Sequence, residues 1–177
     1  MKLIVGLGNY PKEYDNTRHN VGFSVVNSIQ ENENFEEWSE NKKFKGEISN
    51  GIFCGESCIL LKPLTYMNLS GESVILVMKF YKIKPEDLIV IHDEVDFDFG
   101  IVKTSTSRNS AGHNGIKSIN GYVAEGYNRI RVGIGRPEHN SHDISSYVLG
   151  KFTEEEKKQL KDIIEKSILT IKTLIKK

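Results

Sequence analysis

The chain has 177 residues, 38% of them hydrophobic and 27% charged, which is typical of one globular domain, so we expect residues 1–177 to form a single domain. The 24 basic and 24 acidic side chains give a formal net charge of zero, which excludes a protein that binds polyanions through bulk charge. The apolar run at 3–5 is too short for a signal peptide, and no stretch approaches the roughly 20 apolar residues of a membrane span. We therefore expect a cytoplasmic protein without a membrane partner.

Short apolar runs alternate with helical patterns along the chain, and this order predicts an α/β fold in which helices cover a sheet. The charge-dense stretch 31–47 is predicted to be a loop. In chain order, the predicted elements are a strand at 2–8, a helix at 19–30, strands at 44–49 and 58–62, a helix at 70–82, strands at 88–92 and 101–106, a helix at 114–122, a strand at 129–134 and a long amphipathic helix ending near 175.

Charge is distributed unevenly along the sequence. Residues 31–47 are mainly acidic, whereas 98–142 contain six basic residues and three acidic ones. The basic residues of this stretch are Lys103, Arg108, Lys117, Arg129, Arg131 and Arg136. They form the candidate phosphate-binding surface. The eight lysines between 151 and 177 are interpreted as the solvated face of the last helix, with nucleic-acid contact as the alternative.

Polar residues follow three of the predicted strands. Asn9 follows the first strand, Tyr66 and Asn68 follow the strand at 58–62, and Asp93 follows the strand at 88–92. Ligands of open α/β sheets bind beyond the carboxyl ends of the strands, so these residues predict a site at one edge. Each of them alone could instead form a turn or cap a helix.

His19 lies a few residues after the first strand, at the start of a predicted helix that Asn16 or Thr17 could cap. A helix N-terminus favours the neutral imidazole, which is the form that a general base needs. If Asp93 contacts the imidazole, its carboxylate would fix the tautomer and stabilise the imidazolium. The alternative is a purely structural histidine.

Other chemistries find less support in the sequence. No serine or cysteine lies in a nucleophile motif such as G-x-S-x-G, so water is the expected nucleophile. Pro11 stands where a dinucleotide-binding motif would need its third glycine. Cys54 and Cys58 lack a second pair for a zinc site, and we interpret them as buried thiols.

A metal centre is a further alternative, because histidines and carboxylates occur at 92–94, 113 and 139–143. None of them has a spacing specific for a metal site, so we expect no metal and no cofactor. The loop at 110–115 is expected to bring backbone amides and the Asn114 side chain close to a ligand.

Several blocks of this sequence, in order and suitably spaced, resemble the bacterial peptidyl-tRNA hydrolase family. They are KLIVGLGN, Tyr14, TRHNVG, KPLTYMNLSG, HDEVD, AGHNG and RIRVGIGRP, and they cover most of residues 1–150. The resemblance implies a single α/β domain with a mixed twisted sheet between helices. It also implies an esterase that releases peptide from peptidyl-tRNA lost by the ribosome, acting as a monomer without an obligate protein partner.

By matching position, the resemblance implies that His19 is the base and Asp93 its partner. Asn9 would position water or stabilise the oxyanion, and would help to distinguish blocked from free amino groups. The implied substrate-binding residues are Tyr14, Tyr66, Asn68 and Asn114 at the substrate end, with Lys103 and Arg131 on tRNA phosphates.

Two segments depart from the family pattern. Tyr10-Pro11 replaces the usual Pro-Gly after Asn9, and the loop at 105–110 lacks a further lysine that relatives often have, although Arg108 could substitute. Two other function classes stay open at this point. One is a non-catalytic RNA-binding relative with the same fold, and the other is a metallohydrolase of a small ester.

Overall fold

A computed structural model describes residues 1–137 and 143–176 of the chain. The described residues form one sheet with the strand order β2-β4-β5-β1-β6-β8-β7, and β3 pairs with β4. The strands are β1 (Lys2–Gly6), β2 (Asn34–Phe35), β3 (Ser39–Asn41), β4 (Gly46–Phe53), β5 (Glu56–Pro63), β6 (Leu88–Glu94), β7 (Val102–Ser105) and β8 (Asn128–Gly133).

The middle of this sheet is parallel and its margins are antiparallel. Strand β1 pairs in parallel with β5 and β6, and β6 pairs in parallel with β8. Strands β4 and β7 run antiparallel to β5 and β8. The sheet is therefore mixed, as predicted, and the carboxyl ends of β5, β1, β6 and β8 lie at one edge.

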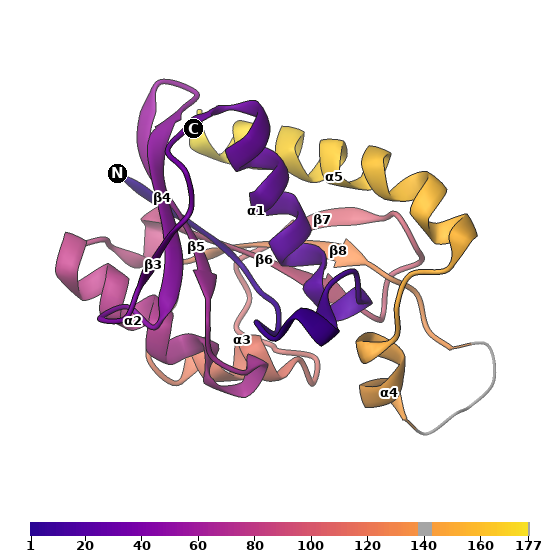
Figure 1. The fold of residues 1–177 in the computed structure, drawn as a ribbon. Coiled ribbons are helices and arrows are strands. Elements are labelled where there is room, and N and C mark those ends of the chain that lie inside the picture. Colours follow the sequence, from indigo (N-terminus) through magenta and orange to yellow (C-terminus); the bar gives the residue numbers. More distant parts are fainter. Residues whose placement is uncertain (138–142, 177) are drawn as a thin grey trace.

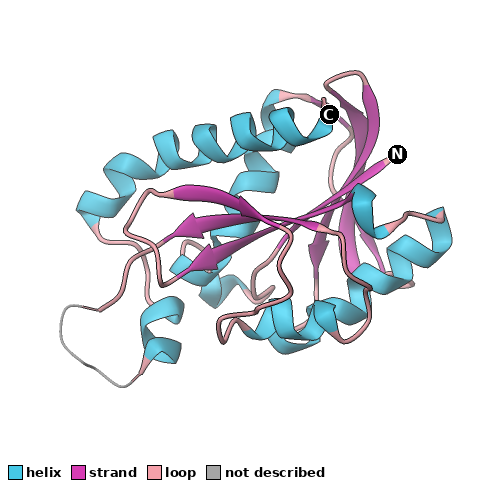
Figure 2. Ribbon diagram, turned by 180° about the vertical axis from the view of Figure 1, so that it is seen from behind, coloured by secondary structure: helices cyan, strands magenta, loops and turns pink. Residues whose placement is uncertain are grey.

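Helices cover both faces of the sheet (Figures 1 and 2). Helices α1 (Val21–Asn32) and α5 (Glu154–Ile175) lie on one face, and α2 (Ser70–Tyr81) and α3 (Asn114–Asn120) lie on the other. Because side chains alternate along a strand, Leu3 and Val5 of β1 pack with α2 and α3, whereas Ile4 packs with α1 and α5. No helix of the described ranges is both long enough and apolar enough to cross a membrane.

Two glycines allow α1 to approach the end of β1 very closely. A Cβ atom on Gly6 would lie 2.3 Å from the carbonyl oxygen of Gly22, and one on Gly22 would lie 2.5 Å from the carbonyl oxygen of Ile91. The short 3₁₀ turn η2 (Arg18–Asn20), which precedes α1, is therefore held against the carboxyl ends of β1 and β6.

The predicted elements are present, but two local predictions were wrong and one helix was missed. The stretch 31–47 is not simply a loop, because β2, β3 and the start of β4 lie in it. Neither Asn16 nor Thr17 caps a helix with its side chain, since the Thr17 hydroxyl donates to the carbonyl of Tyr14 and η2 has no side-chain cap. Helix α4 (Ile144–Leu149) was not predicted, because its six residues are too few to establish a helical period.

Candidate active site

A cleft of about 700 Å³ opens at the carboxyl ends of β1, β5 and β6. The predicted site residues that line it are Asn9, His19, Tyr66, Asn68, Asp93 and Asn114. Segments far apart in the sequence thus bring most of the predicted polar groups to one place. Tyr14, Lys103 and Arg131 are not among the residues that line the cleft.

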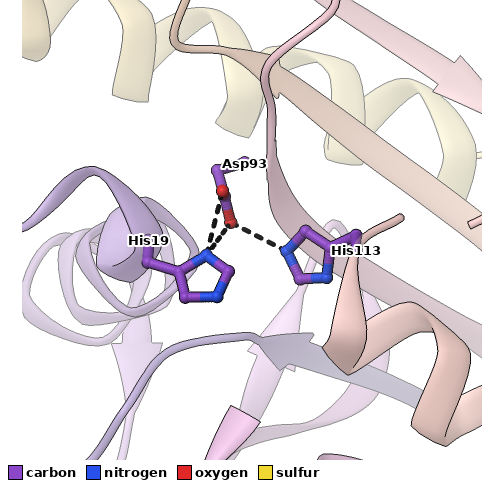
Figure 3. A group of neighbouring side chains, drawn as sticks. All are labelled: His19, Asp93 and His113. Carbon is purple, nitrogen blue, oxygen red and sulfur yellow. Dashed lines mark hydrogen bonds and ion pairs between the residues drawn. The ribbon is translucent and has the colours of Figure 1, made fainter. Parts of the chain in front are cut away.

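His19 and Asp93 form the buried centre of this site (Figure 3). Nδ1 of His19 lies 2.8 Å from Oδ1 and 2.9 Å from Oδ2 of Asp93. Burial alone lowers the pKa of His19, but the charge and hydrogen bond of Asp93 outweigh it and raise the pKa above its ordinary value. An ionised Asp93 can only accept, so Nδ1 carries the proton and Nε2, which faces away from Asp93, is the basic nitrogen.

His113 is the third member of this cluster. Its Nε2 lies 2.8 Å from Oδ1 of Asp93, and its Nδ1 accepts hydrogen bonds from the backbone N–H groups of Gly115 and Ile116. Because Nδ1 accepts, the proton of the neutral ring must lie on Nε2 and is donated to Asp93. His113 therefore caps α3 and stabilises the Asp93 anion in one fixed tautomer.

Two histidines thus donate hydrogen bonds to the carboxylate of Asp93. Burial raises the pKa of Asp93, but His19 and His113 together hold it well below its ordinary value. Asp93 is 2% exposed, so water does little to screen these contacts. The carboxylate stays ionised at neutral pH and can stabilise an imidazolium on His19.

The same three residues are the one group in the described ranges that could hold a metal ion, with ligand atoms within 4.8 Å of one another. The tautomer of His113 argues against that use. To coordinate a metal, Nε2 would have to lose its proton, while the donors at Gly115 and Ile116 prevent Nδ1 from taking one. His139 and His142, considered as ligands from the sequence, lie outside the described residues.

Asn9 is held at both its backbone and its side chain. Asn20 accepts from the N–H of Asn9 at 2.8 Å and donates to its carbonyl at 2.9 Å. Oδ1 of Asn9 accepts from the N–H of Met67 at 2.9 Å. This bond fixes the orientation of the amide and leaves its NH₂ group as the donor that a ligand in the cleft can meet.

The aromatic and amide side chains at the mouth of the cleft are exposed. Tyr66 is 52% exposed, and its ring lies 5.7 Å from that of Tyr10. Asn68 and Asn114 are exposed as well, and Asn114 begins α3. The charge of Glu13 is the main cause of the raised pKa of Tyr14, and Tyr66 contributes to it as well.

Lys103 and Arg131 are directly opposite each other on β7 and β8, beside the cleft. Both cations lie over the ring of Phe97, at 5.0 Å and 4.3 Å from its centroid. Arg131 also donates to the buried carboxylate of Glu94, with Nε and Nη2 at 2.9 Å and 2.8 Å from Oε2. Glu94 lines the cleft, so the ion pair joins the basic surface to it.

Two other arginines of the basic stretch have structural partners. Arg108 and Asn120 exchange side-chain to backbone hydrogen bonds, and Arg129 is buried and donates to the carbonyl of Asn109. Arg108 is therefore tied to the end of α3, which weakens the idea that it substitutes for a missing lysine.

Sequence reasoning missed several residues of the site. It treated His113 only as a possible metal ligand or part of a loop, although its position next to Asn114 was a usable signal. It gave Asn20 no role, and it did not predict that α4 lines the cleft. The α4 residues in the lining are Ile144, Ser145, Val148 and Leu149.

Known proteins resemble this chain over nearly its whole length. Residues 3–177 match a family model described as peptidyl-tRNA hydrolase. A peptidyl-tRNA hydrolase of Rickettsia africae (strain ESF-5) is 46% identical over 166 residues, which cover 94% of this chain and 89% of that protein. One of Clostridium botulinum (strain Alaska E43 / Type E3) is 46% identical over 177 residues, or 99% of this chain and 90% of that protein.

Solved structures also resemble this chain over nearly its whole length. A crystal structure of peptidyl-tRNA hydrolase from Acinetobacter baumannii has a TM-score of 0.92 and 36% sequence identity to this chain. The match covers 99% of this chain and 89% of that one.

Proposed function

Because the chain belongs to the peptidyl-tRNA hydrolase family and is therefore a hydrolase, we propose that it cuts the ester bond between a peptide and the 3′ end of tRNA, with His19 as the base that activates water. The observation that carries this assignment is the fixed tautomer of the His19–Asp93–His113 cluster. That tautomer leaves Nε2 of His19 as a basic nitrogen in the cleft.

In the proposed first step, Nε2 of His19 takes a proton from a water molecule while the water oxygen attacks the ester carbonyl carbon. The resulting imidazolium is stabilised by the Asp93 carboxylate, 2.8 Å from Nδ1. When the tetrahedral intermediate collapses, the same proton passes to the 3′ oxygen of the tRNA, and the peptide leaves as a carboxylic acid, which releases the second proton of the water to solvent and becomes a carboxylate. His19 returns to its neutral form.

Asn9 is proposed to donate to the oxygen on which negative charge develops, or to the attacking water. Asn20 holds its backbone and the N–H of Met67 holds its side-chain amide before the substrate binds, so little reorganisation is needed. The same group would help to distinguish a blocked amino group from a free one.

Tyr14, Tyr66, Asn68 and Asn114 are proposed to bind the substrate end. Amides that meet the peptide main chain do not depend on its side chains, which suits a substrate of variable sequence. Lys103 and Arg131 are proposed to bind tRNA phosphates beside the cleft, where Phe97 supports both cations.

In the cell, this activity would recycle peptidyl-tRNA released from ribosomes, in the cytoplasm. We propose that residues 1–177 act as a single-domain monomer without an obligate protein partner, metal or other cofactor.

The test is turnover of an N-blocked aminoacyl-tRNA by the purified protein, with and without a chelator. Release of the blocked amino acid that does not depend on the chelator supports the proposal. Tight binding without release would favour a non-catalytic RNA-binding protein, and chelator sensitivity without dependence on the tRNA portion would favour a metallohydrolase.

A further inference from the structure

The turn η2 contains three consecutive side chains with different partners. His19 contacts Asp93, and Asn20 holds the backbone of Asn9. Arg18, which precedes them, points to neither and is nevertheless buried, at 8% exposure. Burying a guanidinium is unfavourable unless its donors are satisfied, so this arginine next to the proposed base must have polar partners.

The guanidinium of Arg18 is satisfied by the C-terminal part of the chain. Nε and Nη2 bind the two carboxylate oxygens of Glu156 at 3.1 Å and 2.8 Å, a bidentate pair. Nη1 donates to the carbonyl of Tyr147 at 3.3 Å, and the group lies 4.3 Å from the centre of the Tyr147 ring. Glu156 also accepts from the N–H of Thr153 in the capping box of α5.

Backbone contacts join the same segments. The N–H of Arg18 donates to the carbonyl of Gly150 at 3.0 Å, and Thr17 forms an isolated bridge with Lys151. The segment before His19 is thus attached by main chain and side chain to the junction between α4 and α5.

Helix α4 forms part of the wall of the cleft, and Tyr147 is a residue of this helix. We propose that Arg18 is a positioning residue for the hydrolysis: it sets the orientation of the His19 ring relative to the α4 wall by joining η2 to Tyr147 and Glu156. This inference rests on the proposed function, and it adds a residue that neither lines the cleft nor contacts Asp93.

The test compares Arg18→Met and Arg18→Lys with the unmodified protein. We expect Arg18→Met to lower kcat by about 10–100-fold, because a shift of about 1 Å in a reacting group can reduce the rate by this much. Arg18→Lys keeps the charge but not the bidentate geometry and should give a smaller loss. If His19 moves away from Asp93, its pKa falls and the rising limb of kcat/KM moves to lower pH.

Two further variants separate positioning from stability. Glu156→Gln keeps the capping box, because glutamine can replace glutamate at this position of the motif. It weakens the bond to Arg18, so kcat should fall as it does in the Arg18 variants. Lys172→Met is the matched control, because it removes an ion pair of 2.7 Å between α5 and Glu33, beyond the end of α1 and outside the cleft lining. It should leave kcat unchanged.

A titration of the His19 ring by NMR provides a readout that does not need activity. A changed His19 pKa in the Arg18 variants, with no change in Lys172→Met, supports the inference even if the unmodified protein proves inactive, which would refute only the proposed function. If Arg18→Lys and Glu156→Gln fold, melt at lower temperature and keep both the kcat and the His19 titration of the unmodified protein, Arg18 merely stabilises the fold and the inference is wrong.

Discussion

Nε2 of His113 lies 2.8 Å from Oδ1 of Asp93, the same oxygen that His19 contacts. One carboxylate therefore accepts from two imidazoles that come from distant segments of the sequence. The two contacts should have opposite effects on the base. Asp93 raises the pKa of His19, whereas the hydrogen bond from His113 stabilises the carboxylate and weakens that effect.

Replacing His113 by asparagine should separate its two roles. Asparagine is a good helix cap, so α3 should stay stable, but the shorter side chain should lose the bond to Asp93. The carboxylate would then interact more strongly with His19 and raise its pKa further. We expect the rising limb of kcat/KM to move to higher pH, with a loss in kcat below about tenfold because the proposed mechanism gives His113 no contact with the reacting atoms.

The comparison with His113→Ala provides the control, since alanine removes the cap as well. In urea unfolding, the alanine variant should therefore be less stable than the asparagine variant by about 1 kcal/mol, the contribution of the cap. A pH profile of His113→Asn that superimposes on that of the unmodified protein would contradict the role assigned to the Asp93 contact.

His19→Ala should leave the fold intact and lower kcat by about 10²–10⁴, the usual contribution of a positioned general base. The fold should persist because η2 remains attached through Arg18 and Asn20. Single-turnover kinetics on an N-blocked aminoacyl-tRNA, together with circular dichroism, measure both quantities. Near-normal turnover would remove His19 from the mechanism.

Lys103→Ala and Arg131→Ala should both raise KM and flatten its dependence on salt, because each removes a proposed phosphate contact. The two variants should differ in their free energy of unfolding. Arg131→Ala leaves the buried Glu94 carboxylate without its cation and should cost up to about 3 kcal/mol, whereas Lys103 has no such partner among the described residues.

Lys84→Ala is the matched control, since Lys84 is an exposed lysine just before β6, at the opposite end of that strand. It should change neither KM nor its salt dependence. Shortened substrates with a few 3′ nucleotides should be insensitive to Lys103→Ala. If Lys103→Ala raised KM equally for these short substrates and for full-length tRNA, the phosphate assignment would be wrong.

The sequence predicted the family and the α/β fold correctly, because motif blocks and buried strands depend on short-range patterns. It also predicted that the polar residues after three of the strands lie together, since the carboxyl ends of parallel strands meet at one edge. The roles of these residues stay predictions. Helix α4 has no such pattern, and the bond between Arg18 and Glu156 joins residues 138 positions apart. Pairings of this kind depend on the tertiary fold and leave no local signal.

The wrong cap at Asn16 or Thr17 has a similar origin. The residue before α1 is Asn20, which is a good capping residue, yet its side chain binds Asn9 instead. The tertiary contact with Asn9 thus replaces the helix cap that the local sequence favours. Departures of this kind from local preferences are expected at functional sites.

The stability of the protein should depend on pH through Asp93. Its pKa is lower in the folded state than in the unfolded chain, so its contribution is fully present above about pH 4 to 5 and is lost as pH falls towards the folded pKa. His19 has the opposite effect, because its pKa is higher in the folded state than in the unfolded chain. Its contribution to stability is fully present below the unfolded-state pKa and is lost as pH rises through the folded-state pKa.

Urea unfolding at several pH values measures this dependence. In Asp93→Asn the loss of stability between about pH 5 and pH 3 should be smaller than in the unmodified protein, because the group that must be protonated is absent. An unchanged slope of stability against pH in this range would show that Asp93 is not a source of acid sensitivity.

The same substitution gives the sharpest test of the proposed mechanism. Asp93→Asn removes the charge that raises the pKa of His19, so that pKa should fall and the rising limb of kcat/KM should move to lower pH. This shift of the rising limb is opposite in direction to the shift expected for His113→Asn. At the plateau kcat should fall substantially, because a less basic imidazole takes the proton from water less readily and its imidazolium has lost its counter-charge.

A second effect adds to this loss. The amide NH₂ of asparagine can donate to Nδ1 of His19 and place the proton on Nε2, the wrong tautomer for a base in the cleft; in serine proteases, the equivalent change of the aspartate beside the catalytic histidine lowers kcat about 10⁴-fold. An aminoacyl ester is more reactive than an amide, so we expect a smaller drop here, with KM close to normal. The measurement is kcat and kcat/KM against pH for both proteins on one N-blocked aminoacyl-tRNA. Superimposable profiles with equal kcat would mean that Asp93 only supports the end of β6 and that His19 acts without it.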